Sequence, residues 1–227
     1  MIKNIVIVLL VLLNVNSYSD NKKLSNAEAS YIFYYKDIAA GTMDLSIKNQ
    51  ENFITISTTY DGNFLASLAN KGYRKETSLI KKQNGKLLPK EYTYTDDNET
   101  YEIIFNNNSA KLSSEYFEDQ DINSRNKIYD PISILIILMQ SYPNIESTYS
   151  VISKKNLKIY DYKFNNDAIY KINDKVYSCY SAEYKSGNKV NYYYFSKEHK
   201  NLLIAIKINK NNKEKIRIDL SEIHNLD

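Results

Sequence analysis

The sequence predicts a mainly β protein in which a curved antiparallel sheet forms an incomplete barrel, with one apolar helix packed in its concavity. From residue 43 onward, apolar side chains recur at every second position between short turn sequences, which is the pattern of an antiparallel meander. Residues 132–139 break this pattern, because seven of these eight positions hold large aliphatic side chains. No linker or repeat divides residues 20–227, so we expect them to form a single β-rich domain.

The N-terminus has the pattern of a cleavable signal peptide over residues 1–19. Lys3 supplies a positive charge, and the apolar run at residues 5–13 is shorter than the roughly 20 residues that cross a bilayer. Small residues follow, which predicts cleavage after Ser17 or Ser19. We therefore expect an exported, soluble protein with no transmembrane segment after removal of the signal peptide. The alternative is an uncleaved N-terminal anchor.

The composition argues against a nucleic-acid-binding protein and against a fold held by disulfides. The formal net charge is +3, and basic residues are interspersed with acidic ones, so no basic patch is predicted. Cys179 is the single cysteine, which excludes an internal disulfide, and its strand-like surroundings predict a small packed side chain rather than a reactive thiol. The 22 tyrosines suit half-buried strands, because the ring packs on the sheet while the hydroxyl reaches water.

Strands are expected in order along the chain, about twelve in all. Residues 43–48 and 53–60 alternate on either side of a short turn and predict a hairpin. Residues 64–72 have helical spacing and end in Gly72, which predicts a short helix or an ordered loop. Asn84-Gly85 is the strongest hairpin turn in the sequence.

The remaining strands flank the predicted helix. Those before the helix are expected at residues 73–82, 86–95, 99–106 and 109–117. Those after it are expected at residues 148–153, 157–164, 168–172, 175–184, 189–196, 201–208 and 214–223. Residues 118–127 are polar and charged, which predicts a surface connection that leads to the helix.

Residues 131–142 are predicted to form the apolar helix. Asp130 can cap free backbone amides, and Pro131 at the first helical position loses no hydrogen bond. Around the helix axis, the apolar side chains cover an unusually wide sector. Ile137 lies even on the opposite side, among the polar residues Ser133, Gln140 and Ser141. Exposure of such side chains forfeits roughly 1.5–3 kcal/mol for each large one, so the helix requires a cover.

The cover can be a curved sheet, a protein partner or a lipid-like ligand, because the helix is too short to cross a bilayer. A plain core helix needs no ligand. The functional alternative is a helix that only partly fills the concavity and leaves an apolar cleft. In that case Ile134, Ile137 and Leu138 are the residues expected to touch an acyl chain.

Few residues are suited to catalysis. Only His199 and His224 are present, one in a predicted turn and one near the C-terminus, and both are expected at the surface. Acidic pairs such as Asp96 with Asp97 lie in predicted turns, where solvated charge is expected. Five glycines and no Gly-rich loop disfavour a nucleotide-binding fold. We therefore predict no enzymatic activity, no catalytic residue, no metal site and no cofactor.

Four segments occur in the order and spacing of a known protein family. They are YYKDIAAGTMDLSI with Tyr34, Gly41 and Thr42, LLPKEYTY with Pro89 and Tyr92, DPISILI with Asp130 and Pro131, and YYYFSKEHKNLLIAIKI near the C-terminus. On these segments the chain resembles the domain-of-unknown-function 3108 family. It departs from the family in lacking a Pro-Gly turn before residues 175–184, and in having Leu203 and Ile204 where a Leu-Pro pair is common.

The resemblance implies an exported protein of the bacterial envelope, located in the periplasm, with a half-barrel similar to that of periplasmic lipoprotein carriers. It implies no activity and no catalytic residues. We therefore expect a non-enzymatic binding module for an apolar ligand, either a lipid or a lipoprotein acyl chain, and no nucleic-acid partner. The alternative is an envelope scaffold or assembly factor that binds another protein and has a fully packed core without a ligand.

Overall fold

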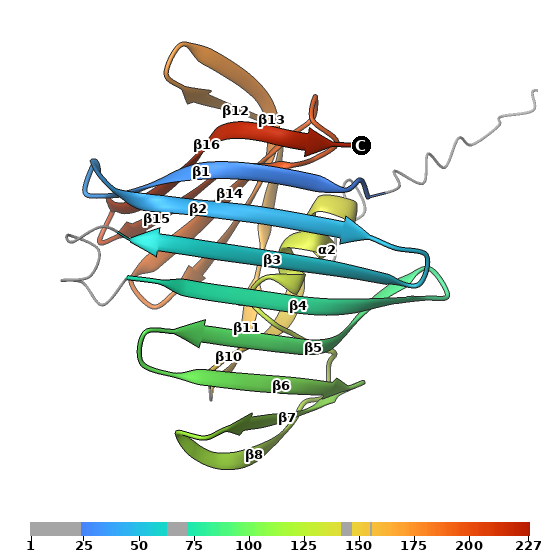
Figure 1. Cartoon of the computed structure of the whole chain (residues 1–227). Coiled ribbons are helices and arrows are strands. Elements are labelled where there is room, and N and C mark those ends of the chain that lie inside the picture. The colour runs from blue at the N-terminus through green and yellow to red at the C-terminus, as the bar shows by residue number, and fades with distance from the viewer. Residues whose placement is uncertain (1–23, 63–71, 142–146, 155) are drawn as a thin grey trace, which may run out of the picture.

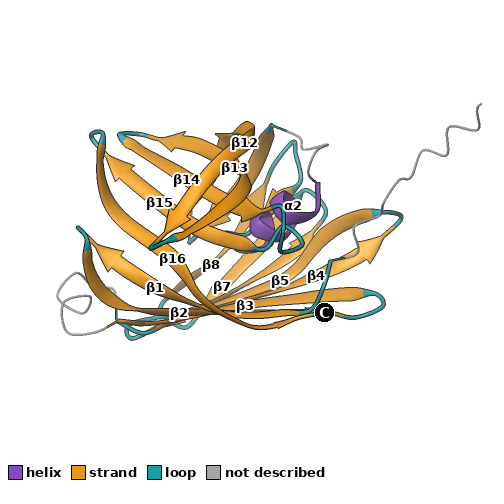
Figure 2. Cartoon of the chain, turned by 90° about the horizontal axis from the view of Figure 1, so that it is seen from above, coloured by secondary structure: helices purple, strands orange, loops and turns teal. Residues whose placement is uncertain are grey.

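The structure contains one large antiparallel sheet that curves back on itself without closing (Figure 1). The computed structural model describes residues 24–62, 72–141, 147–154 and 156–227. Within these residues, thirteen strands follow the order β12-β13-β14-β15-β16-β1-β2-β3-β4-β5-β6-β7-β8, so β12 and β8 are its open edges. Figure 2 shows the sheet wrapped around the helix. The predicted incomplete barrel is confirmed.

The described elements have the following bounds. The first half of the large sheet comprises β1 (Ala27–Tyr35), β2 (Ile38–Asn49), β3 (Phe53–Gly62), β4 (Arg74–Gln83), β5 (Lys86–Asp96), β6 (Thr100–Asn106), β7 (Ser109–Ser114) and β8 (Phe117–Asn123). The second half comprises β12 (Lys163–Ile172), β13 (Lys175–Ser186), β14 (Lys189–Ser196), β15 (Leu203–Lys210) and β16 (Lys213–Leu226). A smaller sheet comprises β9 (Ile128–Tyr129), β10 (Thr148–Ser153) and β11 (Asn156–Asp161), and the described helix is α2 (Ser133–Ser141).

Strand β1 joins the two halves of the large sheet. It pairs with β2 on one side and with the last strand, β16, on the other. Ala27, Ala29, Tyr31 and Phe33 are buried, and the residues between them are at least partly exposed. The prediction that the meander begins at residue 43 was therefore wrong. The alternation of β1 is carried partly by alanines, whose small side chains give a weak apolar signal.

Asparagine supplies much of the left-handed backbone in the hairpin turns. Asn84 and Gly85 have φ angles of 52° and 70°, so they form the two-residue turn that the sequence predicts between β4 and β5. Further turn asparagines with positive φ are Asn107, Asn173, Asn201, Asn211 and Asn212. Asn adopts this conformation more readily than most other residues, so it replaces Gly in a chain that has only five glycines.

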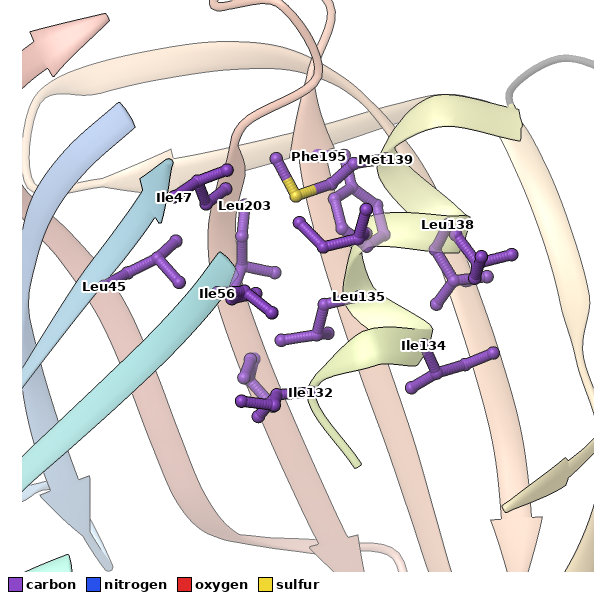
Figure 3. Packing of buried hydrophobic residues seen from close by; sticks show 14 of the residues in the cluster. Leu45, Ile47, Ile56, Ile132, Ile134, Leu135, Leu138, Met139, Phe195 and Leu203 are labelled. Carbon is purple, nitrogen blue, oxygen red and sulfur yellow. The ribbon is translucent and has the colours of Figure 1, made fainter. Parts of the chain in front are cut away.

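Helix α2 lies inside the curve of the large sheet (Figure 2). Every residue from 132 to 139 is at least 92% buried. Leu135 and Met139 point toward β2 and β3, whereas Ile134 and Leu138 point the other way (Figure 3). The helix is thus covered on both sides, as a helix that is apolar all round requires. Within the part of the chain that the structure describes, no helix is long and apolar enough to span a membrane.

Asp130 fixes the start of the helix to the large sheet. Its carboxylate accepts hydrogen bonds from the backbone amides of Ile132 and Ser133, at 3.0 and 2.7 Å, which is the geometry of a helix cap. It also accepts a hydrogen bond of 2.8 Å from the hydroxyl of Ser78 on β4. Burial raises the pKa of Asp130 from 3.8 to about 6, and the hydrogen bonds to Ser133, Ser78 and Ile132 oppose this rise.

The helix begins at Ser133, two residues later than the sequence predicts. Pro131 and Ile132 form a turn instead, and the amide of Leu135 donates to the carbonyl of Ile132, so the first turn is tighter than an α-helical turn. The predicted end at residue 142 lies outside the described residues.

Two other strand predictions were wrong. Strand β8 occupies most of residues 118–127, which were predicted to be a surface connection. An edge strand pairs on one side only and tolerates polar residues, so its apolar pattern is weak. Residues 157–164 form parts of two strands in different sheets, separated by the buried Tyr162. The predicted signal peptide at residues 1–19 and the feature predicted at residues 64–71 lie outside the described residues.

Tyr180→Phe tests how the sheet holds the helix. The buried hydroxyl of Tyr180 on β13 donates to the carbonyl of Leu138, at 2.7 Å. Its removal leaves a buried helix carbonyl without this donor, so we expect the free energy of unfolding to fall by about 1–2 kcal/mol. Tyr116→Phe is the matched control, because Tyr116 is 61% exposed. Equal stability of the two variants in urea titrations would contradict this role of Tyr180.

Asp130→Asn tests the buried carboxyl. Asp130 stays protonated up to about pH 6 in the folded chain but only to about pH 3.8 in the unfolded chain, so its neutral form contributes stability that is complete below pH 4 and is lost as pH rises through 6. The variant keeps a capping oxygen and cannot ionise. We expect the stability of the natural chain relative to the variant to fall by about 2–3 kcal/mol between pH 4 and 7. Parallel pH profiles in urea titrations would contradict the raised pKa.

Candidate functional site

A cavity of about 430 Å³ lies between the start of the helix and the large sheet. Pro131, Ile132 and Leu135 form its helical side. We call it the isoleucine cavity, because one wall consists of apolar side chains from three adjacent strands. These are Phe33 of β1, Ile206 and Ile208 of β15, and Ile216 and Ile218 of β16.

Strand alternation and register build the apolar wall. Ile206 is paired with Ile218, and Ile208 with Ile216, so the four isoleucines form two cross-strand pairs. The period of two places all four on the concave face. Ile208 and Ile216 are only partly buried, although they contact the core. They are therefore the members of the wall with apolar surface left uncovered.

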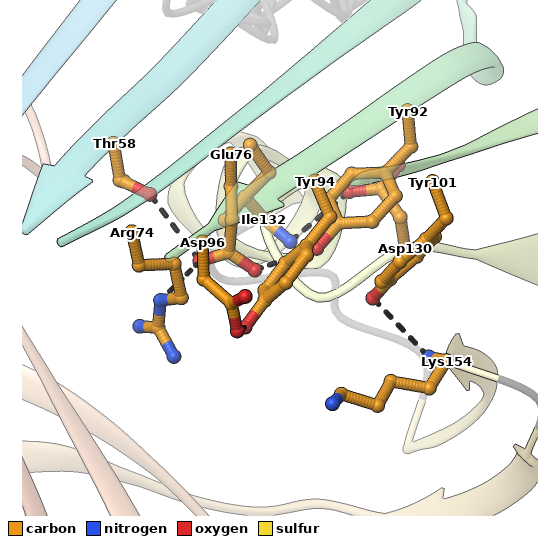
Figure 4. A network of polar contacts seen from close by, with 10 residues as sticks. All are labelled: Thr58, Arg74, Glu76, Tyr92, Tyr94, Asp96, Tyr101, Asp130, Ile132 and Lys154. Atoms are coloured by element: carbon orange, nitrogen blue, oxygen red, sulfur yellow. Dashed lines mark hydrogen bonds and ion pairs between the residues drawn. The ribbon is translucent and has the colours of Figure 1, made fainter. Parts of the chain in front are cut away.

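The opposite wall is polar and comes from β3 to β6 and the end of β10 (Figure 4). Glu76 is buried and accepts hydrogen bonds from the hydroxyls of Tyr92, at 2.6 Å, and Thr58, at 3.4 Å. Arg74 lies over the ring of Tyr60, with 3.9 Å from its guanidinium carbon to the ring centroid, and its Nε is 3.4 Å from the carboxylate of Glu76. This wall holds a charged pair beside tyrosine rings.

Arg74 is held in its charged form. Burial lowers the pKa of its guanidinium. The negative charge of Glu76 and the neighbouring tyrosines raise this pKa by a larger amount, so the net shift is upward. The Nε atom is buried and within ion-pair distance of Glu76. Among the described residues, however, no acceptor is aligned to form a hydrogen bond with its N–H group. The Glu76 contact is therefore electrostatic and leaves hydrogen-bonding capacity on the guanidinium.

Asp96 and Lys154 complete the polar wall. The carboxylate of Asp96 accepts hydrogen bonds from the hydroxyl of Tyr94 and from the backbone amides of Asn98 and Glu99. Burial raises the pKa of Asp96, but these hydrogen bonds lower it more, so it is below its usual value. Lys154 forms an ion pair with Glu99.

The structure places the predicted ligand-contact residues away from this cavity. Ile134, Ile137 and Leu138 are 2%, 8% and 0% exposed, and none of them lines it. The residues of this segment that line it are Pro131 and Ile132, in the turn before the helix, and Leu135, in the first helical turn. Helical period alone does not show which apolar residues face a cavity. Arg74 and Glu76 contact residues of the neighbouring strands β3 and β5. The isoleucine wall that faces them comes from β15 and β16, which are distant in sequence, so no local pattern marked the pair as part of a cavity.

A second cavity, of about 610 Å³, lies at the other end of the helix. It is larger, but its apolar lining residues are only Leu24 and Met139, and the others are polar or charged. Apolar ligands are bound by predominantly apolar walls with a few polar groups. The isoleucine cavity fits that description better, and we take it as the candidate site.

Outside the isoleucine cavity, the side chains of types that could act as nucleophiles or bases have structural roles. Ser30 lies 2.8 Å from the Nε2 of His224, but it donates its hydroxyl proton to Asp44, at 2.6 Å. His224 therefore acts as the donor to Ser30, which is the reverse of nucleophile activation. Burial raises the pKa of the Cys179 thiol to about 11, which disfavours the reactive thiolate. In the described part of the chain, no three His, Cys, Asp or Glu residues are grouped to hold a metal.

The comparisons with known proteins bear on the fold. No protein-family model matches the chain, and no curated protein sequence matches it. Among solved structures, it is similar to a beta-barrel-like protein of domain of unknown function DUF1849 from Brucella abortus. The TM-score is 0.52 at 7% sequence identity, over 88% of this chain and 98% of that chain. At this identity the likeness shows the fold alone.

These findings support the expected barrel-like fold and its likeness to proteins of unknown function. Membership of the domain-of-unknown-function 3108 family is not supported by them. The chain has the fold of a beta-barrel-like protein whose domain is of unknown function.

Proposed function

We propose that this protein is a non-enzymatic binding module that holds the apolar part of a lipid-like molecule in the isoleucine cavity. The observation that carries the proposal is the cavity itself, with an isoleucine wall on one side and a polar wall on the other. Its volume of about 430 Å³ is within the range of roughly 300–1,000 Å³ that is usual for ligand sites.

The apolar wall supplies the driving force for binding. Ile208 and Ile216 retain exposed surface, and a ligand that covers it gains roughly 25 cal/mol for each Å² of apolar area removed from water. The wall belongs to the large sheet, so it is held rigidly by its cross-strand pairs. A rigid site loses little conformational entropy when a ligand binds.

We further propose that the protein acts in the periplasm after export. The pattern of residues 1–19 supports this proposal, because it has the charged, apolar and small-residue regions of a signal peptide in order. A carrier in that compartment shelters apolar chains from water between two membranes. The candidate ligands are a lipid and the acyl chain of a lipoprotein.

Ile208→Asn tests the binding proposal with the uncharged dye Nile red, whose emission rises and shifts to shorter wavelength in apolar sites. The substitution places a polar amide in the apolar wall, so we expect several-fold weaker dye binding than in the natural chain. Ile169→Asn is the matched control, because Ile169 is 72% exposed and does not line the cavity. If the natural chain gives no dye signal, or if both variants bind equally, the proposal fails.

An envelope scaffold that binds another protein is the second candidate. The observation in its favour is the open edge at β12, where Ile169 and Val176 of the adjacent β13 are 72% and 57% exposed. Exposed edge strands can pair with a strand of a partner. This alternative predicts that Ile169→Lys abolishes a stoichiometric complex in envelope extracts and that Ile208→Asn preserves it. A complex insensitive to Ile169→Lys would contradict it.

A further inference from the structure

We infer that the ligand of the isoleucine cavity is a single-chain anionic amphiphile, with its chain along the isoleucine wall and its acidic head at Arg74. This inference rests on the proposed function and narrows the class of ligand. Three properties of the cavity carry it: the separation of its walls, its unused hydrogen-bond donors and its size.

The separation of the walls favours a ligand with two chemically different parts. The isoleucines of β15 and β16 line one side of the cavity with purely apolar side chains. The wall from β3 to β6 contains charged side chains and tyrosine hydroxyls (Figure 4). A wholly apolar ligand removes water from this wall and leaves its spare donors, such as Arg74 Nε, without a partner, which costs free energy. An amphiphile matches both walls at once.

The unused hydrogen-bonding capacity in the polar wall is on donors. A guanidinium has five N–H donors, and the contacts of Arg74 with Glu76 and Tyr60 engage only part of them. The side chain of Lys154 is 54% exposed, so its ammonium can donate to a further group beside Glu99. Both cations are positioned to bind an acceptor that carries negative charge.

The carboxylates of the same wall are already engaged. Glu76 accepts from Tyr92 and Thr58, and Asp96 accepts from Tyr94 and two backbone amides. Asp61 also lines the cavity, but it is exposed at the rim, where water screens its charge. Apart from Asp61, a cationic head therefore finds carboxylates that already accept hydrogen bonds, whereas an anionic head finds guanidinium N–H groups of Arg74 that are not engaged.

The size of the cavity favours one chain. A volume of about 430 Å³ is near the lower end of the usual range of roughly 300–1,000 Å³. A cavity of this size matches one acyl chain better than the two long chains of a phospholipid. A fatty acid or another single-chain acid fits the same dimensions.

Three probes with the same twelve-carbon chain test the charge of the head: laurate, 1-dodecanol and dodecyltrimethylammonium. Displacement of Nile red at pH 7.5 gives their relative affinities. We expect laurate to bind about tenfold or more tightly than 1-dodecanol, because charge-assisted hydrogen bonds to Arg74 are made only with the carboxylate. Dodecyltrimethylammonium should bind most weakly of the three.

The double variant R74Q/E76Q tests where the head binds. Removal of both charges avoids an unpaired Glu76 in a buried position. We expect laurate and 1-dodecanol then to bind within about twofold of each other, while the affinity for 1-dodecanol stays near its natural value and reports an intact cavity. Lys75→Gln is the matched control, since Lys75 adjoins Arg74 but is exposed and does not line the cavity. It should leave the preference for laurate unchanged.

A second variant covers the case in which the double variant does not fold. E76Q keeps Arg74 and removes the nearest negative charge, so laurate should bind several-fold more tightly. The inference is overturned if dodecyltrimethylammonium binds as well as laurate, if the preference for laurate persists in R74Q/E76Q, or if E76Q weakens laurate binding. If none of the three probes binds the natural chain, the proposed function itself fails.

Discussion

The rest of the structure depends on burial of a helix that is apolar on nearly every side. Exposure of the seven large aliphatic residues at positions 132–139 would cost about 10–20 kcal/mol, which is comparable to the whole net stability of a typical domain. One flat sheet covers only one side of a helix. The large sheet therefore has to bend around α2 (Figure 2), and its two edges, β12 and β8, are not paired with each other.

The attachment of the helix determines where hollow space remains. Asp130 ties its start to Ser78 on β4, and Tyr180 and Asn201 donate to the carbonyls of Leu138 and Met139 near its end. Fixed at both ends, the helix fills the middle of the concavity. The isoleucine cavity lies beyond its start, where the apolar wall of β15 and β16 continues without a helix to cover it. The candidate site is thus a consequence of how the helix is held.

Much of the fold was predictable from the sequence, because its causes are local. Period-two alternation predicts most strands of the meander, and Asn84-Gly85 predicts its hairpin. Features that depend on distant contacts were harder to predict. Strand β1 finds its second partner, β16, at the other end of the chain. Arg74 has Glu76 and Tyr60 as neighbours on β4 and β3, but it meets the isoleucine wall of β15 and β16 only after the sheet has curved. The sequence predicted an apolar helix in a concavity, but not which of its faces the cavity meets.

The most direct measurement is a pair of crystal structures of the protein, one grown with laurate and one without. The account predicts continuous extra density for one chain between Leu135 of the helix and the isoleucines of β15 and β16, with its carboxylate beside the guanidinium of Arg74. It also predicts that the position of α2 is the same in both crystals. A cavity filled by the protein's own side chains in both structures, or laurate bound only outside the curve of the sheet, would contradict it.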